Sequence, residues 1–549
     1  MNRLAIALDL GTSGFRAQAM DLVNGEMIST VITNRHPLPG TNVIDHLHFA
    51  LEFGVETARD LILEAINKIL GQTGTSLDDV IRLAVCGNPT QLSLFQGMEI
   101  RDLAFAGSRK LQALGVTTPA RTAEIRSAGE FPGLRLPKSC DIIIPPAVHD
   151  EVGADALALI IQSGILDCEE TAIAIDYGTN AEMALSYQGR LFTGSAAAGP
   201  ALEGQHINCG TLAMPGAIVD MEAAGPYHRL LVLDSNMLPT AGALIDLRVA
   251  GEVVGSTGPV AKAITGTGVI AALDQALEAG IISLPEIRTA DRQLHFGGGI
   301  FLSEADLGEA GKAIGAIRAG YVTLGIEAGI APIEIRTAYL AGASGTYVDA
   351  HKSGRLGLIP PCVDKVKQVG NTSLAMAREL VLAPSKLAMM ADLAETLRHT
   401  HTMFAKSKIF SQLFLLELSR WTEGMPMATY REMLSRFHLP DLPESAPMIV
   451  QAMKRDISDL GKRGLTILGS IGLVVALQPQ GCLACMGCME ICPAGALAID
   501  TNTNPTSISL NHALCNGVAC RRCEPVCEPK VFHLTDFFGA KRATASEGA

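Results

Sequence analysis

The chain has 549 residues, carries a formal net charge of −13 and is 48% hydrophobic. One hydrophobic core rarely supports this length, so we expect about two to four domains, and the hydrophobic content excludes a disordered chain. The acidic balance offers no electrostatic footprint for nucleic acid or an anionic membrane, and the most apolar run, residues 464–477, is shorter than the roughly 20 residues that a membrane-spanning helix needs.

The first predicted element is an apolar strand that begins at residue 4 and runs into a turn, followed by two more strands. Asp9 lies near the end of the first strand, and the turn contains Gly11, Thr12 and Ser13. Glycine lets the backbone approach a phosphate, while hydroxyls and successive N–H groups hold its oxygens. A carboxylate at a strand end can hold the water shell of Mg²⁺. Because Asp9 interrupts the apolar stretch, we expect no signal peptide and a cytoplasmic chain.

Residues 171–187 repeat this pattern of strand, turn and strand. The residues that correspond to the first turn follow 167 positions later and are Asp176, Gly178, Thr179 and Asn180. One such turn is equally typical of a simple hairpin. Two copies in matching context predict two similar lobes, each with a phosphate loop.

The two loops resemble the phosphate-1 and phosphate-2 motifs of the ASKHA superfamily, which includes actin, sugar kinases and Hsp70 chaperones. That resemblance implies ATP bound between two RNase H-like lobes. It also implies an adenosine motif, a glycine-rich turn after a strand late in the second lobe. Residues 337–345 fit this motif, with Gly342, Ala343 and Gly345 leaving room for a purine and ribose. The glycine turn at 297–299 is either a second neighbour of the nucleotide or a flexible loop.

Acidic residues just before the second loop are candidates for polarising the attacking water, because that segment often carries such a residue in the superfamily. Asp155 is the first candidate, and Asp150 or Glu151 comes next. The same residues are equally typical of a helix N-terminus. Glu203, in the turn at 199–204, is either a contact to bound metal or a partner, or a structural turn residue. The predicted catalytic carboxylates are Asp9, Asp155 and Asp176.

The 13 cysteines are unevenly distributed: five are scattered, as reduced core thiols are, and eight crowd into residues 482–527. The eight form two runs, C-x2-C-x2-C-x3-C-P and C-x4-C-x2-C-x3-C. The first is the spacing that wraps a [4Fe–4S] cluster. Zinc is the alternative, since C-x2-C pairs also form tetrahedral sites, but eight cysteines without histidine favour iron and sulfur.

The two runs resemble two-cluster ferredoxins, in which the fourth cysteine of each run binds the other cluster. This resemblance implies one cluster on Cys482, Cys485, Cys488 and Cys527. It implies a second on Cys515, Cys520, Cys523 and Cys492. Two clusters suggest an electron relay.

The expected fold is α/β: a two-lobed, actin-like ATPase core, a helical connecting region and a C-terminal α+β ferredoxin-like domain with two [4Fe–4S] clusters. We expect a first lobe with connecting segments over 1–165 and a second lobe with the adenosine motif over 166–380. The helical connecting region is expected over 381–477 and the cluster domain over 478–549.

Several blocks of the chain together resemble the reductive activators of corrinoid proteins. They lie at 87–90, 152–155, 199–204, 313–320, 340–345, 359–360 and 369–371. Many of these activators begin with a plant-type ferredoxin domain, which we do not expect in this chain. Its layout places the predicted clusters after the ATPase core. This layout resembles the activators that serve corrinoid proteins of methylamine methyltransferases in methanogens.

This resemblance implies an oxidoreductase that uses Mg–ATP to reduce an inactive Co(II) corrinoid protein to the Co(I) state that accepts methyl groups. The implied partners are the corrinoid proteins of methylamine systems and a low-potential electron donor that the sequence does not identify. One rival is an ATP-driven electron injector of the kind that activates 2-hydroxyacyl-CoA dehydratases, although those typically share one cluster between subunits. The other rival is a non-enzymatic, actin-like scaffold whose clusters sense redox state.

Overall fold

The computed structural model describes residues 3–105, 107–198, 200–204, 206–250, 253–255, 258–469, 471–492, 494–517 and 520–539. The chain forms two compact units. Unit 1 consists of Met1–Pro146, Ala377–Leu387 and Leu460–Ala549, and unit 2 of Ala147–Met376 and Ala388–Asp459. Among the described residues, no helix has the length and apolar character needed to cross a membrane.

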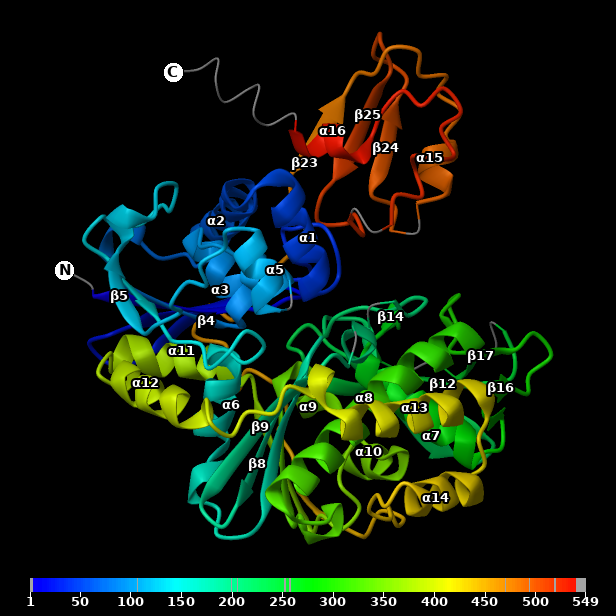
Figure 1. Cartoon of the computed structure of the whole chain (residues 1–549). Coiled ribbons are helices and arrows are strands. Elements are labelled where there is room, and N and C mark those ends of the chain that lie inside the picture. The colour runs from blue at the N-terminus through cyan, green and yellow to red at the C-terminus, as the bar shows by residue number, and fades with distance from the viewer. Residues whose placement is uncertain are drawn as a thin grey trace. The chain divides into compact units, whose positions relative to one another are not determined.

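Unit 1 is built on a seven-stranded mixed sheet with the order β22-β3-β2-β1-β4-β6-β5. Its first three strands form an antiparallel meander, and β4 and β6 then add in parallel on the other side of β1. Figure 1 labels β4 and β5 of this sheet. The strands are β1 (Leu4–Leu10), β2 (Phe15–Asp21), β3 (Met27–Thr33), β4 (Val80–Gly87), β5 (Glu124–Ser127), β6 (Asp141–Ile144) and β22 (Leu465–Leu468). Strand β1 is buried along its whole length. The predicted phosphate loop therefore begins at the end of a firmly packed strand.

The helices of unit 1 follow the meander and the parallel strands. They are α1 (Val43–Phe53), α2 (Val55–Gln72), α3 (Pro89–Gln96), α4 (Arg101–Ala104) and α5 (Ser108–Ala113). The C-terminal part of the unit is a small three-stranded sheet with the order β23-β25-β24. Its elements are β23 (Val474–Leu477), α15 (Gly487–Glu490), β24 (Leu497–Asp500), β25 (Ser507–Asn511) and α16 (Leu534–Gly539).

Unit 2 repeats the same sheet topology. Its six-stranded sheet has the order β21-β20-β19-β7-β8-β9, again an antiparallel meander followed by parallel strands. The strands are β7 (Ala172–Tyr177), β8 (Ala181–Tyr187), β9 (Arg190–Ala196), β19 (Thr337–Ala341), β20 (Lys365–Gly370) and β21 (Ile449–Gln451). The duplication seen in the sequence is therefore a duplication of sheet architecture.

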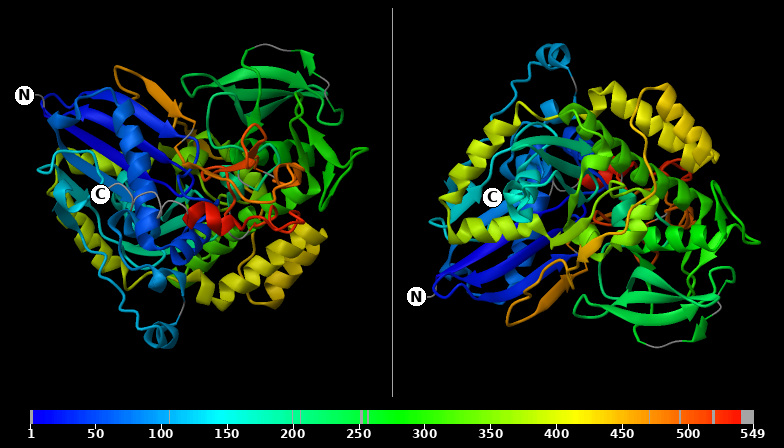
Figure 2. Two further views of the ribbon diagram at one scale, coloured as in Figure 1. Left: turned by 90° about the horizontal axis from the view of Figure 1, so that it is seen from above. Right: turned by 90° about the horizontal axis from the view of Figure 1, so that it is seen from below.

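An insertion between β9 and β19 gives unit 2 a second sheet of five strands, drawn in green in Figure 2. Its strands are β10 (Ala217–Ala224), β11 (Tyr227–Leu233), β12 (Pro239–Ile245), β13 (Val253–Gly255) and β14 (Ala263–Ile264). Two hairpins follow, formed by β15 (Ile282–Ser283) with β16 (Glu286–Ile287) and by β17 (Gln293–His295) with β18 (Phe301–Ser303). The turn at 297–299 connects the second of these hairpins.

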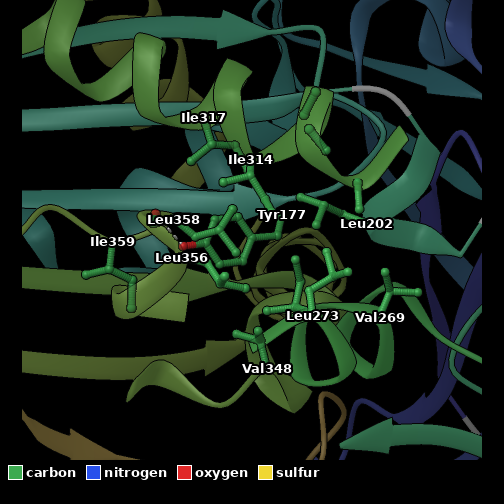
Figure 3. Packing of buried hydrophobic residues seen from close by; sticks show 14 of the residues in the cluster. Tyr177, Leu202, Val269, Leu273, Ile314, Ile317, Val348, Leu356, Leu358 and Ile359 are labelled. Atoms are coloured by element: carbon green, nitrogen blue, oxygen red, sulfur yellow. Dashed lines mark hydrogen bonds between the residues drawn. The ribbon is translucent and has the colours of Figure 1, made fainter. Parts of the chain in front are cut away.

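The helices of unit 2 enclose a continuous apolar core that reaches from Tyr177 in β7 to Leu358 (Figure 3). They are α6 (Ala154–Ser163), α7 (Gly266–Glu278), α8 (Glu304–Ala328), α9 (Gly342–Tyr347), α10 (Ala350–Leu356), α13 (Lys408–Glu423) and α14 (Met427–Arg436). The Tyr177 hydroxyl donates to the Leu358 carbonyl over 2.9 Å. This bond fixes the residue next to Asp176 inside the core.

Helix α8 packs closely against α13 because its glycines leave room for the neighbouring side chains. A Cβ atom at Gly311 would lie 2.5 Å from the Cβ of Trp421, and one at Gly315 would lie 2.6 Å from the Cβ of Glu417. Across the same interface the buried Arg318 guanidinium pairs with the Glu417 carboxylate at 3.1 Å. Removal of either partner would leave a buried charge uncompensated.

The region 381–477 is helical only in part. Helices α11 (Thr372–Leu382) and α12 (Lys386–Leu397) lie in sequence at the division between the units, and α13 and α14 follow. The chain then becomes extended, and β21 and β22 each join the edge of a different sheet. Strands of three and four residues carry too little periodicity to be recognised, since tertiary pairing decides them.

Candidate functional site

The predicted phosphate loop of unit 1 links β1 to β2 and is almost fully buried. Asp9 is 6% exposed and pairs across the two strands with Arg16, whose guanidinium lies 3.8 Å from the carboxylate. Thr12 accepts a hydrogen bond of 2.9 Å from the Asn88 side chain. Glycine is required at position 11, since a Cβ there would lie 2.7 Å from the carbonyl oxygen of Gly14. The loop therefore gathers a carboxylate, hydroxyls and open backbone at one strand end, as the sequence predicts, and Ser13 is also buried in it.

The matching loop of unit 2 links β7 to β8 and contains Gly178, Thr179 and Asn180. The Thr179 hydroxyl donates to the Glu203 carboxylate. Glu203 belongs to a short 3-10 helix, η4 (Pro200–Glu203), which follows β9 in the chain. Its side chain contacts the loop between β7 and β8. Gly199 of the predicted turn lies outside the described residues.

The glycine-rich turn after β19 lies directly beside Asp176. Ala341 and Asp176 are paired in the parallel register of β19 and β7. A Cβ at Gly342, where φ is +76°, would lie 2.4 Å from Oδ1 of Asp176. Helix α9 starts at this glycine and contains Ala343 and Gly345, and the Ser344 hydroxyl donates to the Leu202 carbonyl over 2.8 Å. Unit 2 thus brings its predicted phosphate and adenosine motifs together at one edge of its sheet.

Glu182 is an acidic residue of this site that the sequence did not reveal. It lies directly opposite Asp176 in the antiparallel register of β7 and β8, is 6% exposed, and accepts a 3.4 Å hydrogen bond from Ser195. Burial raises the pKa of Glu182 well above its ordinary value, and the neighbouring carboxylates of Asp155, Asp176 and Glu203 raise it further. Burial and the neighbouring carboxylates thus both favour the protonated form of Glu182. The available signal was a lone acidic residue in an otherwise apolar strand.

Asp155 lies in the first turn of α6, where its carboxylate accepts from the N–H of Ala156 over 2.9 Å. The structure therefore satisfies the helix N-terminus interpretation and also brings Asp155 close enough to raise the pKa of Glu182. Glu151, in the preceding loop, turns elsewhere: its Oε2 lies 3.9 Å from Nε2 of His401, which is buried. Burial raises the pKa of Glu151 and lowers the pKa of His401 to about 4. Neither Oε2 of Glu151 nor Nε2 of His401 makes a hydrogen bond to a described residue.

The eight C-terminal cysteines fall into two sets of electrostatic neighbours. Burial raises the pKa of Cys488, and the thiols that add to the rise are Cys527, Cys482 and Cys485. We call these four the first cysteine group. The fourth cysteine of the second run is thus a neighbour of the first run.

Burial raises the pKa of Cys515 to about 12, with further contributions from Cys523, Cys492 and Cys520. These four, the second cysteine group, line one pocket. Backbone N–H groups of Ala496 and Gly517 donate to the sulfurs of Cys492 and Cys515 over 3.3 and 3.4 Å. Pro493, which follows the first run, lies outside the described residues.

The thiol groups fit cofactors that bind thiolates. Closely grouped, desolvated thiols lose their protons most readily to a bound metal, which replaces the proton charge. Within the described part of the chain no three Cys, His, Asp or Glu side chains lie close enough to share one metal ion. Within the described residues, none of the eight C-terminal cysteines forms a disulfide.

Comparison with known proteins places these features in one family context. Residues 170–431 match the family described as "C-terminal domain of RACo the ASKHA domain", and residues 4–167 match "RACo middle region". The chain is 48% identical to a Methanosarcina barkeri protein named Co(II) methylated amine-specific corrinoid protein reductase, over 90% of this chain and 92% of the relative. It is 22% identical to the corrinoid activation enzyme RamQ of Eubacterium limosum, over 74% of this chain and 70% of the relative.

A solved structure shares the fold. The reductive activator for corrinoid,iron-sulfur protein superposes with a TM-score of 0.63 at 25% sequence identity, covering 76% of this chain and 66% of that chain.

Proposed function

Since the chain belongs to the family of reductive activators of corrinoid proteins, we propose that it uses ATP to reduce the cobalt of corrinoid proteins from Co(II) to Co(I), and that its clients are those of methylated-amine methyl transfer. The observation that carries the proposal is the 48% identity to a corrinoid protein reductase along 90% of the chain. Two phosphate loops and two cysteine groups in the same chain support it.

We assign Mg–ATP to the residues that the two loops gather. Asp9 in the loop of unit 1 and Asp176 in the loop of unit 2 are each a carboxylate that can hold the water shell of Mg²⁺, which keeps several waters and takes few carboxylates. Thr12, Ser13, Gly178, Thr179 and Asn180 bind phosphate oxygens through hydroxyls and backbone N–H groups. Gly342, Ala343 and Gly345 accommodate the adenosine, and Asp155 polarises the attacking water. The protonated Glu182 keeps a fourth charge out of the acidic cluster.

The two cysteine groups hold one [4Fe–4S] cluster each in this proposal. Such clusters supply one-electron transfer. The cysteine thiolates would supply negative charge to balance the iron. The N–H groups of Ala496 and Gly517 would stabilise that charge at Cys492 and Cys515. Neighbouring groups from interleaved runs suit a relay between an electron donor and the corrinoid.

ATP is needed because Co(I) is difficult to reach from ordinary biological reductants. Driving an unfavourable one-electron equilibrium from 1:99 to 99:1 takes about 5.5 kcal/mol, on the order of 240 mV. ATP binding and hydrolysis can supply this free energy if they alter the docking of the corrinoid protein or the ligation of its cobalt. The electron donor is a separate low-potential protein in this scheme.

The proposal is tested by following Co(I) formation through its visible absorption, using anaerobically purified protein, a corrinoid protein of a methylated-amine system and a low-potential reductant. We expect Co(I) only when ATP is present. Asp9→Ala is expected to abolish the ATP-dependent rate and leave the cluster absorbance intact. Asp78→Ala, an exposed carboxylate of the same unit, is the matched control and is expected to retain the rate.

Equal Co(I) formation with and without ATP would contradict the proposal. Activation of a 2-hydroxyacyl-CoA dehydratase in place of the corrinoid protein would favour the electron-injector rival. Cluster oxidation that changes nucleotide turnover with no electron transfer to any acceptor would favour the scaffold.

A further inference from the structure

Unit 1 contains a buried polar cluster that the proposed chemistry does not use. His36, Gln91 and His46 are 0–3% exposed and come from three different segments: the loop after β3, helix α3 and helix α1. The two imidazole rings stack with their centroids 4.0 Å apart. Burial lowers the pKa of His36 well below its ordinary value and the pKa of His46 to about 3. Both rings are therefore neutral.

The hydrogen bonds of this cluster run in one direction. The Leu38 N–H donates to Nδ1 of His36 over 3.1 Å, so the proton of that ring lies on Nε2. Nε2 of His36 contacts Oε1 of Gln91 at 2.9 Å, and Nε2 of Gln91 contacts Nδ1 of His46 at 2.8 Å. One amide thus bridges two neutral histidines, and rotation of that amide would break both buried hydrogen bonds. The other ring nitrogen of His46, Nε2, is buried without a hydrogen-bond partner in the described part of the chain.

The cluster is connected to the phosphate loop through Asn88, the N-cap of α3. The Asn88 side-chain oxygen accepts from the N–H of Gln91 over 3.0 Å, and its amide donates to the Thr12 hydroxyl over 2.9 Å. Any movement of Thr12 on nucleotide binding acts on this cap. The cap in turn fixes the first turn of the helix that carries Gln91.

The cluster is also connected to the second cysteine group. Two residues beyond Leu38, the Gly40 N–H donates to the carbonyl of Cys515 over 2.9 Å. Gly517 packs against the same turn, because a Cβ there would lie 3.5 Å from the Gly40 nitrogen. At the other end of α1, Glu52 pairs with Arg521 at 2.7 Å. The loop of the second cysteine group is therefore held at both ends of the helix that carries His46.

We propose that the His36–Gln91–His46 cluster is a positioning device that transmits the nucleotide state of the Thr12 loop to the second cysteine group through the 36–42 turn and α1. This inference rests on the proposed function, since it assumes nucleotide at one end and a cluster at the other. A merely structural core would bury these polar groups without connecting Thr12 to Cys515.

The chain offers a matched pair of variants. Gln91→Met keeps the side-chain length and removes both hydrogen bonds to the histidines. Gln18→Met makes the same change at another fully buried glutamine of unit 1, whose amide donates to Thr30 over 2.9 Å. The measured quantity is the midpoint potential of the cluster bound by the second cysteine group. Its EPR signal is identified as the one that Cys520→Ala lacks. The potential is measured by redox titration with and without the non-hydrolysable ATP analogue AMP-PNP.

We expect AMP-PNP to shift that potential in the wild-type protein and in Gln18→Met, by an amount that changes the reduction equilibrium at least about tenfold, or about 59 mV for one electron. In Gln91→Met the shift is expected to disappear while AMP-PNP still binds. An equal shift in Gln91→Met and Gln18→Met would overturn the inference.

A second measurement needs no variant. Hydrogen–deuterium exchange of the wild-type protein is expected to slow in the peptide covering residues 36–42 when AMP-PNP binds. Unchanged exchange there, with slower exchange in the phosphate loop, would overturn the relay. Failure of the relay would leave ATP-dependent Co(I) formation unaffected, whereas failure of the proposed function would remove Co(I) formation itself.

Discussion

Glu182 illustrates how a single residue can change the chemistry of an acidic site. Its carboxyl faces Asp176 across two strands, and like charges directly opposite one another destabilise a sheet. Retaining a proton on Glu182 removes this repulsion.

Replacing Glu182 by Gln is expected to stabilise the protein at neutral pH. Because the folded-state pKa of Glu182 is raised, the folded state holds a proton that the unfolded state has lost, and stability falls as pH rises from about 4.5 towards the folded pKa. Glutamine mimics the protonated form and lacks this dependence. Thermal unfolding of both proteins between pH 4.5 and 8 should show a difference in midpoint that grows with pH.

Nucleotide affinity provides the control for that experiment. Since glutamine is neutral like the protonated carboxyl, we expect ATP to bind Glu182→Gln within about threefold of wild type. A variant whose melting midpoint tracks wild type at every pH would show that Glu182 is ionised in the folded protein.

At the scale of elements, the interleaving of the two cysteine runs makes a prediction about iron content. Cys485 and Cys527 belong to the first cysteine group. The variants Cys485→Ala and Cys527→Ala should therefore each lose the iron of the same cluster. Their double variant should therefore lose no more than either single variant, about half of the iron. Combining Cys485→Ala with Cys520→Ala should remove nearly all of it.

Iron analysis and EPR of the anaerobically purified variants decide between these outcomes. Cys209→Ala, an exposed thiol outside both groups, should retain all the iron. Additive iron loss in the Cys485/Cys527 double variant would mean that the runs are not interleaved.

The glycine face of α8 predicts opposite effects for one substitution at two positions. Gly311→Ala places a Cβ 2.5 Å from Trp421, so the interface with α13 must open, which costs about 1–3 kcal/mol. Gly308→Ala meets no atom within 4 Å and should stabilise the helix by about 0.5–1 kcal/mol. Denaturant unfolding measures both, and equal effects would contradict the close packing.

At the scale of the whole molecule, the sequence revealed what is repeated and missed what depends on tertiary contacts. Asp9 and Asp176 were recognisable because each ends a strand before a glycine turn, 167 residues apart. Glu182 was not, because its counterpart in the first copy is Phe15. His36 and Gln91 meet only after folding, and neither periodicity nor spacing indicates that contact.

The relay in unit 1 has a thermodynamic consequence for the complete protein. If nucleotide binding changes the potential of the second cysteine group's cluster, then reduction of that cluster must change nucleotide affinity by the same factor, because coupling free energies between two sites are reciprocal. A shift of about 59 mV in a one-electron potential corresponds to a tenfold change in the dissociation constant.

Equilibrium binding of AMP-PNP to the oxidised and to the dithionite-reduced protein should therefore give a ratio of dissociation constants that equals the one calculated from the redox titration. In Gln91→Met both effects should vanish together. Equal affinities for the oxidised and the reduced wild-type protein, with no shift in the potential, would contradict the relay, and the buried histidine pair would then be part of the core alone.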